Sequence, residues 1–270
     1  MEEYFEGRGT ALAKDGLKAL SNTLAGIYYI PFKTGIALQF SFSGQSIPNR
    51  IDVKNDKGVK IYFDAVETAA RVELGKGLIR KTFLDPEAVL EKYKPDAAEQ
   101  LVWHVAAHEV GHAIYNLLTV EEALKEEGGA EIITLLEEPR AELTAMFTLR
   151  LLHEKNVLDL PHLKEALAHF ALDALRYFAK YNSEPLRPYI IFQTYAFNMY
   201  ASKGYIAEDA SGKLVLDDSK TMDVLDAFSE RFLAILECED KADGKTLTRF
   251  LDEMQDETDL IRRVVAAVNA

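Results

Sequence analysis

The stretch WHVAAHEVGHAIYN, residues 103–116, constrains this chain more than any other, because it holds three of the six histidines. His104, His108 and His112 follow one another at intervals of four residues. On an α-helix, such residues share one face, and successive ones lie about 6 Å apart along the axis. The flanking residues are mostly apolar, so we expect this face in or beside a buried layer. An unpaired imidazole is costly there, whereas a ligated one is satisfied.

His108 and His112 flank Glu109 in the pentapeptide HEVGH. This is the H-E-x-x-H pattern, in which two imidazoles bind one zinc ion and the glutamate takes a proton from the bound water. His104 and His112 lie about 12 Å apart along the helix axis, so the three histidines cannot all bind one ion. We expect His104 to pack or hydrogen-bond near the site, with a substrate contact as the alternative. The pattern alone also fits a purely structural amphipathic helix.

A catalytic zinc site needs a third protein ligand and one open position. The best candidate segment is LLEEPRAELTAMFTLRLL, in which Glu138 and Glu142 are four residues apart and share a helical face. Pro139 either opens this helix at its first turn or kinks a longer helix that begins near Glu131. Acidic residues at a helix start also favour the helix dipole, so spacing alone does not choose a ligand. The apolar face of this helix is predicted to consist of Leu143, Met146 and Phe147.

Composition narrows the class of protein. The chain has 270 residues, 48% of them hydrophobic, which is enough to bury a sizeable core. Its 31 Lys and Arg against 44 Asp and Glu give a net charge of -13, which argues against nucleic-acid and anionic membrane partners. The single cysteine, Cys238, excludes an internal disulfide framework, and we assign it no role. No secretory signal or membrane-spanning run is evident, so we expect a cytoplasmic protein.

The sequence predicts strands in the first part of the chain and mainly helices after it. A period-two pattern over residues 36–42 and the segment VKIYFDA each predict a strand, and from about Asp64 helical periodicity dominates. The sequence YIAEDASGKLVLDD predicts a hairpin turning at Ser211 and Gly212, followed by two C-terminal helices. We therefore predict a mainly α fold with a small β portion (α+β). It forms a single catalytic domain, 1–270, with a strand-containing subdomain at 1–65 and a helical zinc-binding subdomain at 66–270.

The two motifs together carry a family resemblance. HEVGH followed by EEPRAEL resembles the M49 peptidases, the dipeptidyl peptidase III family, whose second motif is E-E-C-R-A-E with cysteine in place of Pro139. Upstream, SGQSIPN resembles the family's G-x-N-x-P-N segment. Downstream, IIFQTYAFNMYASKG resembles more weakly the late helix that closes the site. The resemblance covers roughly residues 44–205 and implies a helical, gluzincin-like zinc metallopeptidase lobe with a short N-terminal sheet.

The resemblance assigns roles that spacing leaves open. It implies that Glu138 is the third ligand beside His108 and His112, with Glu109 as the base. Glu137 and Glu142 would then accept from the ring N–H groups of the two histidines, which fixes their tautomers. Arg140 would be a structural or charge-balancing partner of these carboxylates.

The resemblance also implies substrate contacts. Ser46 stands where the family has the first of two asparagines that hold the peptide's N-terminus, and Asn49 retains the second. Tyr189 stands near the position where the family has a histidine that stabilises the transition state. The hydroxyl of Tyr189, or of Tyr195 one to two turns on, could supply the donor to the oxyanion instead. The chain corresponds to the zinc-bearing lobe alone, so a second lobe or self-association would complete the cleft.

We therefore expect a zinc metallopeptidase that hydrolyses short peptides with one Zn²⁺ per chain. The alternative is a non-catalytic or regulatory zinc-binding lobe that binds peptides, and a third reading is a structural helical protein. Two weaker expectations remain. His162 and His169 share a helical face and could form a second metal site, and VKIYFDA could be the edge strand on which a peptide lies. The residues that are more typical of core than of a substrate platform are Tyr189, Phe192, Tyr195, Phe197 and Tyr200.

Overall fold

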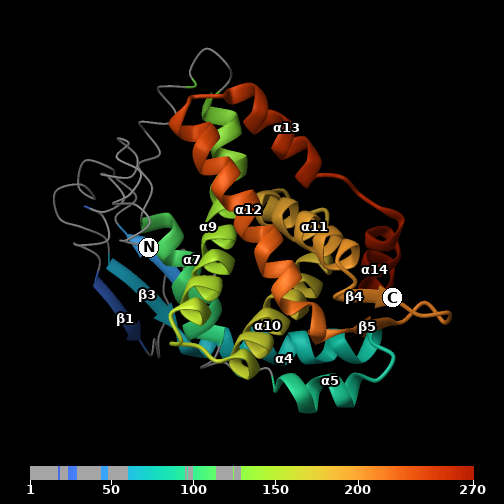
Figure 1. Ribbon diagram of the computed structural model, residues 1–270. Coiled ribbons are helices and arrows are strands. Elements are labelled where there is room, and N and C mark those ends of the chain that lie inside the picture. Colours follow the sequence, from blue (N-terminus) through green and yellow to red (C-terminus); the bar gives the residue numbers. More distant parts are fainter. Residues whose placement is uncertain are drawn as a thin grey trace.

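Most of the described chain is helical, and the strands are short, which confirms the mainly α fold with a small β portion. The computed structural model describes Lys18 and residues 24–28, 44–47, 60–94, 96, 100–113, 124 and 129–270. Figure 1 shows a small sheet at one side of the molecule, beside α7, and a larger body of helices at the other. The C-terminus lies in the helical body.

The N-terminal sheet has three described strands, β1 (Leu24–Tyr28), β2 (Gly44–Ile47) and β3 (Lys60–Asp64). Their order is β1-β3-β2, with β3 parallel to β1 and antiparallel to β2. Both edges of β3 are therefore paired, so the expectation that VKIYFDA forms an open edge for a peptide is wrong. The strand predicted over residues 36–42 lies outside the described residues. The sheet ends where the helical part begins, and the division into subdomains at residue 65 stays a prediction.

Aspartates fix where several helices begin. Asp64 accepts from the backbone N–H groups of Val66 and Glu67 at 3.0 and 3.1 Å, and so caps the first helix after the sheet. Asp85 and Asp159 cap their helices in the same way. Pro86 directly follows Asp85, and Pro161 lies two residues after Asp159, so each proline falls in the first turn of its helix. The helices of the first half are α4 (Ala65–Thr82), α5 (Pro86–Tyr93), the π-helix η2 (Gln100–Val105) and α7 (Ala106–Ala113).

The long helix α9 (Gly129–Glu154) is the centre of the molecule, and it packs against α7, α11 and α12. Pro139 lies inside it, so the longer-helix alternative is correct, and the helix begins at Gly129, two residues before Glu131. The proline has no N–H to donate to the carbonyl of Leu135. The predicted apolar face is confirmed by full burial of Leu143, Met146 and Phe147.

The hairpin predicted near Gly212 is present, but the chain after it forms three described helices rather than two. Gly212 has a positive φ of 79°, and Asp209 accepts from the N–H of Ser211 at the turn. The additional helix arises because Asp243 caps a new start and so splits the C-terminal segment. The remaining elements are α10 (Leu160–Phe178), η4 (Glu184–Leu186), α11 (Arg187–Ser202), β4 (Ile206–Glu208), β5 (Leu214–Leu216), η5 (Asp218–Lys220), α12 (Thr221–Asp240), α13 (Gly244–Met254) and α14 (Asp259–Asn269).

A buried ion pair joins α9 to α12. The guanidinium of Arg140 lies 2.5 Å from the carboxylate of Glu239, and both side chains are almost fully removed from solvent. Burial raises the pKa of Glu239, while the charge of Arg140 opposes that rise. The pair links two segments that are 99 residues apart in the sequence.

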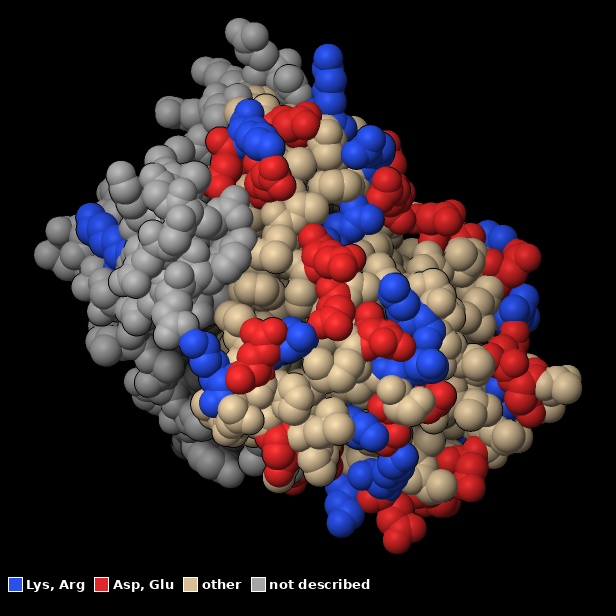
Figure 2. Space-filling model, in the orientation of Figure 1, with Lys and Arg blue, Asp and Glu red and all other residues tan. Residues whose placement is uncertain are grey.

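Surface charge is mixed rather than segregated on the face shown in Figure 2, where acidic and basic side chains alternate over the helical body. Arg150, for example, contacts both Glu154 and Asp226 at 2.7 Å. Among the described residues, no helix combines the length and the apolar character that crossing a membrane requires.

We predict that Glu239→Ala lowers the free energy of unfolding by about 3 kcal/mol, because it removes the buried counter-charge of Arg140. Chemical denaturation measures this loss. Glu237→Ala is the matched control, since Glu237 pairs with Lys241 at the surface of the same helix, and it should change stability little. Equal effects of the two substitutions would contradict the importance assigned to the buried pair.

Candidate metal centre

Two helices bring three potential ligand atoms together. His108 and His112 lie on α7, and their Nε2 atoms are 3.1 Å apart. Glu138 on α9 places Oε2 at 3.2 Å from Nε2 of His108 and at 3.3 Å from Nε2 of His112. Among the described residues, this is the one group of three or more metal-binding side chains whose ligand atoms converge.

The triangle fits a zinc ion. With zinc–ligand bonds of about 2.0–2.2 Å, the ligand atoms of a tetrahedral site lie about 3.3–3.5 Å apart. The three observed separations of 3.1 to 3.3 Å are close to that edge length. Glu138 Oε2 is buried and lacks a hydrogen-bond donor, which a bound cation would satisfy. Three ligand atoms leave a fourth tetrahedral position open, as in catalytic rather than structural zinc sites.

Two further carboxylates face the other ring nitrogens. Oε1 of Glu142 lies 3.4 Å from Nδ1 of His108, and Oε1 of Glu137 lies 3.5 Å from Nδ1 of His112. Because an ionised carboxylate can only accept, these contacts favour a proton on each Nδ1 and a free lone pair on each Nε2. The structure thus brings together the five side chains that the resemblance joined: His108, His112, Glu137, Glu138 and Glu142.

Charge and burial oppose each other at these acids. Burial would raise the pKa of Glu138, but the rings of His108 and His112 hold it well below its usual range. Glu142 is buried as well, yet the neighbouring histidines lower its pKa to about 2. Burial raises the pKa of Glu109, although the same two histidines on either side lower it. Glu109 is therefore the acid of the cluster whose protonation is easiest, which suits a group that accepts a proton.

The cluster has a solvent-facing side and a dry side. The side chain of Glu137 is 38% exposed, and those of His112 and Glu138 are 16% and 18% exposed. Glu142, by contrast, is 2% exposed. A water molecule or substrate would therefore reach the triangle from the side of His112 and Glu138.

The separation of α7 and α9 depends on Gly111. A Cβ atom added at Gly111 would lie 2.7 Å from Cα and 3.0 Å from the carbonyl oxygen of Ala141. These contacts are to backbone, which cannot rotate away. Gly111 precedes His112, and Ala141 lies between Glu138 and Glu142, so this contact sets how closely the ligands approach across the two helices.

The two tyrosines proposed as oxyanion donors lie in different surroundings. Tyr189, on α11, stacks on His108 with ring centroids 6.2 Å apart, and burial, followed by the charge of Glu138, raises its pKa far above its usual range. Tyr195 is buried, and its hydroxyl accepts from Nε of Arg231 at 3.2 Å. Tyr189 and Tyr195 are six residues apart, which on an α-helix corresponds to one full turn plus about 240° of rotation. The two rings therefore point to different faces of α11. Tyr189 is the better placed of the two, and Tyr195 belongs to the core.

The core prediction for the aromatic series holds with one exception. Phe192, Tyr195, Phe197 and Tyr200 are buried, whereas Tyr189 is only partly buried. Tyr177 of α10, which the sequence did not point to, stacks on Tyr189 with ring centroids 5.5 Å apart. The available signal was the run of polar residues inside an otherwise apolar helix, His169, Asp173 and Tyr177, at intervals of four.

Arg140, predicted to balance the charge of the clustered carboxylates, forms its short ion pair with Glu239 instead. Its charge still contributes to lowering the pKa of Glu137, as the last of several causes after the hydrogen bond from His112. The direct partners of the carboxylates are the histidines. Arg140 therefore acts mainly as a link between α9 and α12.

Of the two predicted substrate contacts, the structure describes only Ser46. Ser46 is in β2, where it pairs in register with Ile61 of β3, and β2 passes within packing distance of α7. Asn49 lies outside the described residues. The strand that carries Ser46 is thus beside the helix that carries the histidine pair.

The other histidines take separate partners. His104 lies 3.1 Å from Oε2 of Glu142, so it hydrogen-bonds next to the cluster. His162 is exposed and contacts Asp159, whereas the ring of His169 is buried and contacts the carbonyl of Tyr93 at 2.9 Å. The second metal site considered for His162 and His169 is therefore not formed. The two residues lie about 10 Å apart along α10.

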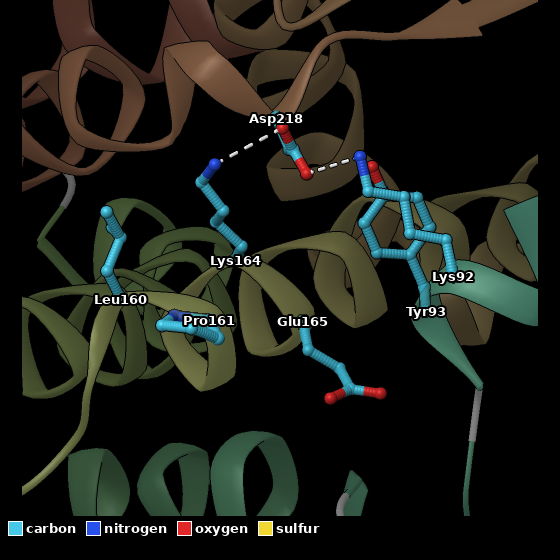
Figure 3. A pocket seen from close by; sticks show the side chains of 7 residues that line it. All are labelled: Lys92, Tyr93, Leu160, Pro161, Lys164, Glu165 and Asp218. Carbon is cyan, nitrogen blue, oxygen red and sulfur yellow. Dashed lines mark hydrogen bonds and ion pairs between the residues drawn. The ribbon is translucent and has the colours of Figure 1, made fainter.

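The described residues also line a surface cavity of about 380 Å³ between α5, α10 and η5. Lys92 and Lys164 both reach Asp218, at 2.7 and 3.4 Å (Figure 3). The ammonium groups are thus already paired with a carboxylate. The cavity shares no lining residue with the histidine and glutamate cluster, and we assign it no chemistry.

The fold and the cluster define a helical domain with H-E-x-x-H on one helix and a converging glutamate on a second. Two solved structures share this fold. One is dipeptidyl-peptidase III from Corallococcus sp. strain EGB, which matches 100% of this chain with a TM-score of 0.71 and 13% sequence identity. The other is DPP III from Caldithrix abyssi, which matches 84% of this chain with a TM-score of 0.64 and 18% sequence identity. The matches span 52% and 42% of those chains, respectively.

The likeness confirms the resemblance to dipeptidyl peptidase III at the level of fold. This chain spans about half the length of the structures it matches. No protein-family model matches the sequence, and no curated protein matches it.

We predict that Gly111→Ala lowers the free energy of unfolding by about 1–3 kcal/mol, because the added methyl group forces α7 away from α9. Thermal or chemical denaturation measures the change. Gly75→Ala in α4 is the matched control, since no described atom lies within 4 Å of its added Cβ. That substitution should stabilise the helix by about 0.5–1 kcal/mol, and a loss as large as that of Gly111→Ala would contradict the close-approach argument.

Proposed function

We propose that this protein is a zinc-dependent metallopeptidase that hydrolyses peptide bonds in short peptides. The observation that carries the proposal is the convergence of Nε2 of His108, Nε2 of His112 and Oε2 of Glu138 within 3.3 Å of one another. The likeness of the fold to two dipeptidyl-peptidase III structures supports the same reaction class.

His108, His112 and Glu138 would hold one zinc ion, which would polarise a water molecule and the scissile carbonyl group. Glu109 follows His108 directly, is 6% exposed and lies beside both histidines. From there its carboxylate accepts a proton from the attacking water and passes it to the leaving amine. Glu137 and Glu142, which lie 3.5 and 3.4 Å from the Nδ1 atoms of His112 and His108, would orient the two rings for metal binding through Nε2.

Tyr189 is the proposed donor to the carbonyl oxygen as negative charge develops on it. Its ring stacks on that of His108, and its high pKa keeps the hydroxyl protonated at neutral pH. We further propose that Ser46 and Asn49 contact the peptide's N-terminal end, since β2 lies beside α7. The subdomain that carries them, 1–65, would then form one wall of the substrate site and 66–270 the metal-binding wall.

A second candidate is a zinc-binding lobe that binds peptides without cleaving them. The chain spans 42% and 52% of the two solved structures whose fold it shares. A second lobe or a second copy of this chain would then complete the cleft.

We expect one zinc ion per chain in protein purified without added metal, measured by atomic emission against protein concentration. His112→Ala should abolish stoichiometric binding because it removes one of three ligands. His162→Ala, which alters an exposed histidine, is the control and should leave the stoichiometry unchanged. A wild-type chain that binds no zinc, even when zinc is added, would refute both candidate functions.

Glu109→Gln is expected to retain zinc and to reduce cleavage of a mixed peptide library by about 100-fold or more, since the amide cannot accept the proton. Mass spectrometry of the library measures both the loss and the lengths of the products. Glu131→Gln, an exposed residue of α9, is the matched control. If wild-type protein binds zinc but cleaves no peptide, the non-catalytic lobe is the correct function.

A further inference from the structure

The carboxylate of Glu142 lies between two histidines on the dry side of the cluster. Its Oε1 atom is 3.4 Å from Nδ1 of His108, which is an ion-pair contact, since Nδ1 makes no well-aligned hydrogen bond. Nε2 of His104 lies 3.3 Å from Oε1 and 3.1 Å from Oε2 of the same carboxylate. A chain of contacts therefore runs from His104 through Glu142 to a proposed zinc ligand.

The direction of these contacts follows from the chemistry of the groups. An ionised carboxylate only accepts, so Nε2 of His104 carries the proton and donates it to Glu142. Glu142 is 2% exposed and has little access to water as an alternative donor. Without His104, the carboxylate would lose its hydrogen-bond donor and could rotate away from the ring of His108.

His104 is itself held in place. Its side chain is 8% exposed, and its ring stacks on Phe170 of α10 with centroids 3.9 Å apart and planes 29° apart. It lies in the π-helix η2, immediately before α7. A π-turn has more residues per turn than an α-turn, so it aims His104 differently from the histidines of the α-helix. This arrangement lets His104 and His108 approach one carboxylate from two sides.

We propose that His104 is a positioning residue of the metal centre, which holds Glu142 so that the ring of His108 keeps Nε2 directed at the zinc ion. The inference rests on the proposed zinc site. His104 contacts the ligand only through Glu142, so its role is to sharpen metal affinity rather than to bind metal or substrate.

Zinc affinity tests this role directly. His104→Phe keeps a ring that can stack on Phe170 but removes the donor, and we expect it to raise the zinc dissociation constant about tenfold or more, as loss of a partner that orients a metal ligand does. His104→Gln restores an N–H donor and should recover much of the wild-type affinity. Competition with a chromophoric chelator measures both constants on the full chain, without reference to activity.

Two controls separate positioning from packing. Phe170→Leu removes the stacked ring while leaving His104 and Glu142 intact, so it should change thermal stability more than zinc affinity. In the Glu142→Gln background, His104→Phe should cause little further loss of affinity, because both substitutions break one chain of contacts. Fully additive losses, or wild-type affinity in His104→Phe, would overturn the proposal and leave His104 as a packing residue.

Long-range nitrogen NMR of the zinc-loaded wild-type chain gives a test that does not depend on how the variants fold. We expect His104 to carry its proton on Nε2 and His108 on Nδ1. A proton on Nδ1 of His104 with a bare Nε2 would contradict the assigned donor. A wild-type chain that binds no zinc would instead refute the proposed function itself, so the two failures are distinguishable.

Discussion

The backbone contact between Gly111 and Ala141 determines how near α7 and α9 can lie, and the metal centre depends on that distance. All three proposed ligands project into the space between these two helices. Ligand atoms must agree to within a few tenths of an ångström for a zinc ion to bind well. Two small residues at the crossing point allow the ligand atoms to meet at 3.1 to 3.3 Å.

The carboxylates of the cluster differ in solvent exposure and in the groups that they contact. Glu137 is the most exposed and holds its histidine at the solvent side, while Glu142 is buried and is held in turn by His104. Glu109, between the two proposed histidine ligands in the sequence, is more easily protonated, because burial raises its pKa by more than the two histidines lower it. The three carboxylates therefore differ in access to water and in proton affinity.

Much of this arrangement is readable from the sequence, because helical periodicity fixes which residues share a face. The four-residue spacing of His108 and His112 predicts their shared direction, and the resemblance predicts that Glu138 and its acidic neighbours meet them. Periodicity could not supply contacts between distant segments. The pairing of Arg140 with Glu239 and the placement of Tyr177 beside Tyr189 depend on how helices pack. The third C-terminal helix was missed because a single aspartate cap, Asp243, divides an otherwise continuous helical pattern.

Because of the ion pair between Arg140 and Glu239, a chain that forms this site must extend beyond the two motifs to α12. All three proposed ligands occur before residue 140. Arg140, two positions after Glu138, pairs with the buried carboxylate of Glu239 on α12. A fragment that ended after α9 would retain every proposed ligand but would lack the buried carboxylate that lies 2.5 Å from the guanidinium of Arg140. The candidate metal centre therefore depends on the folded helical body, and not on the two motifs alone.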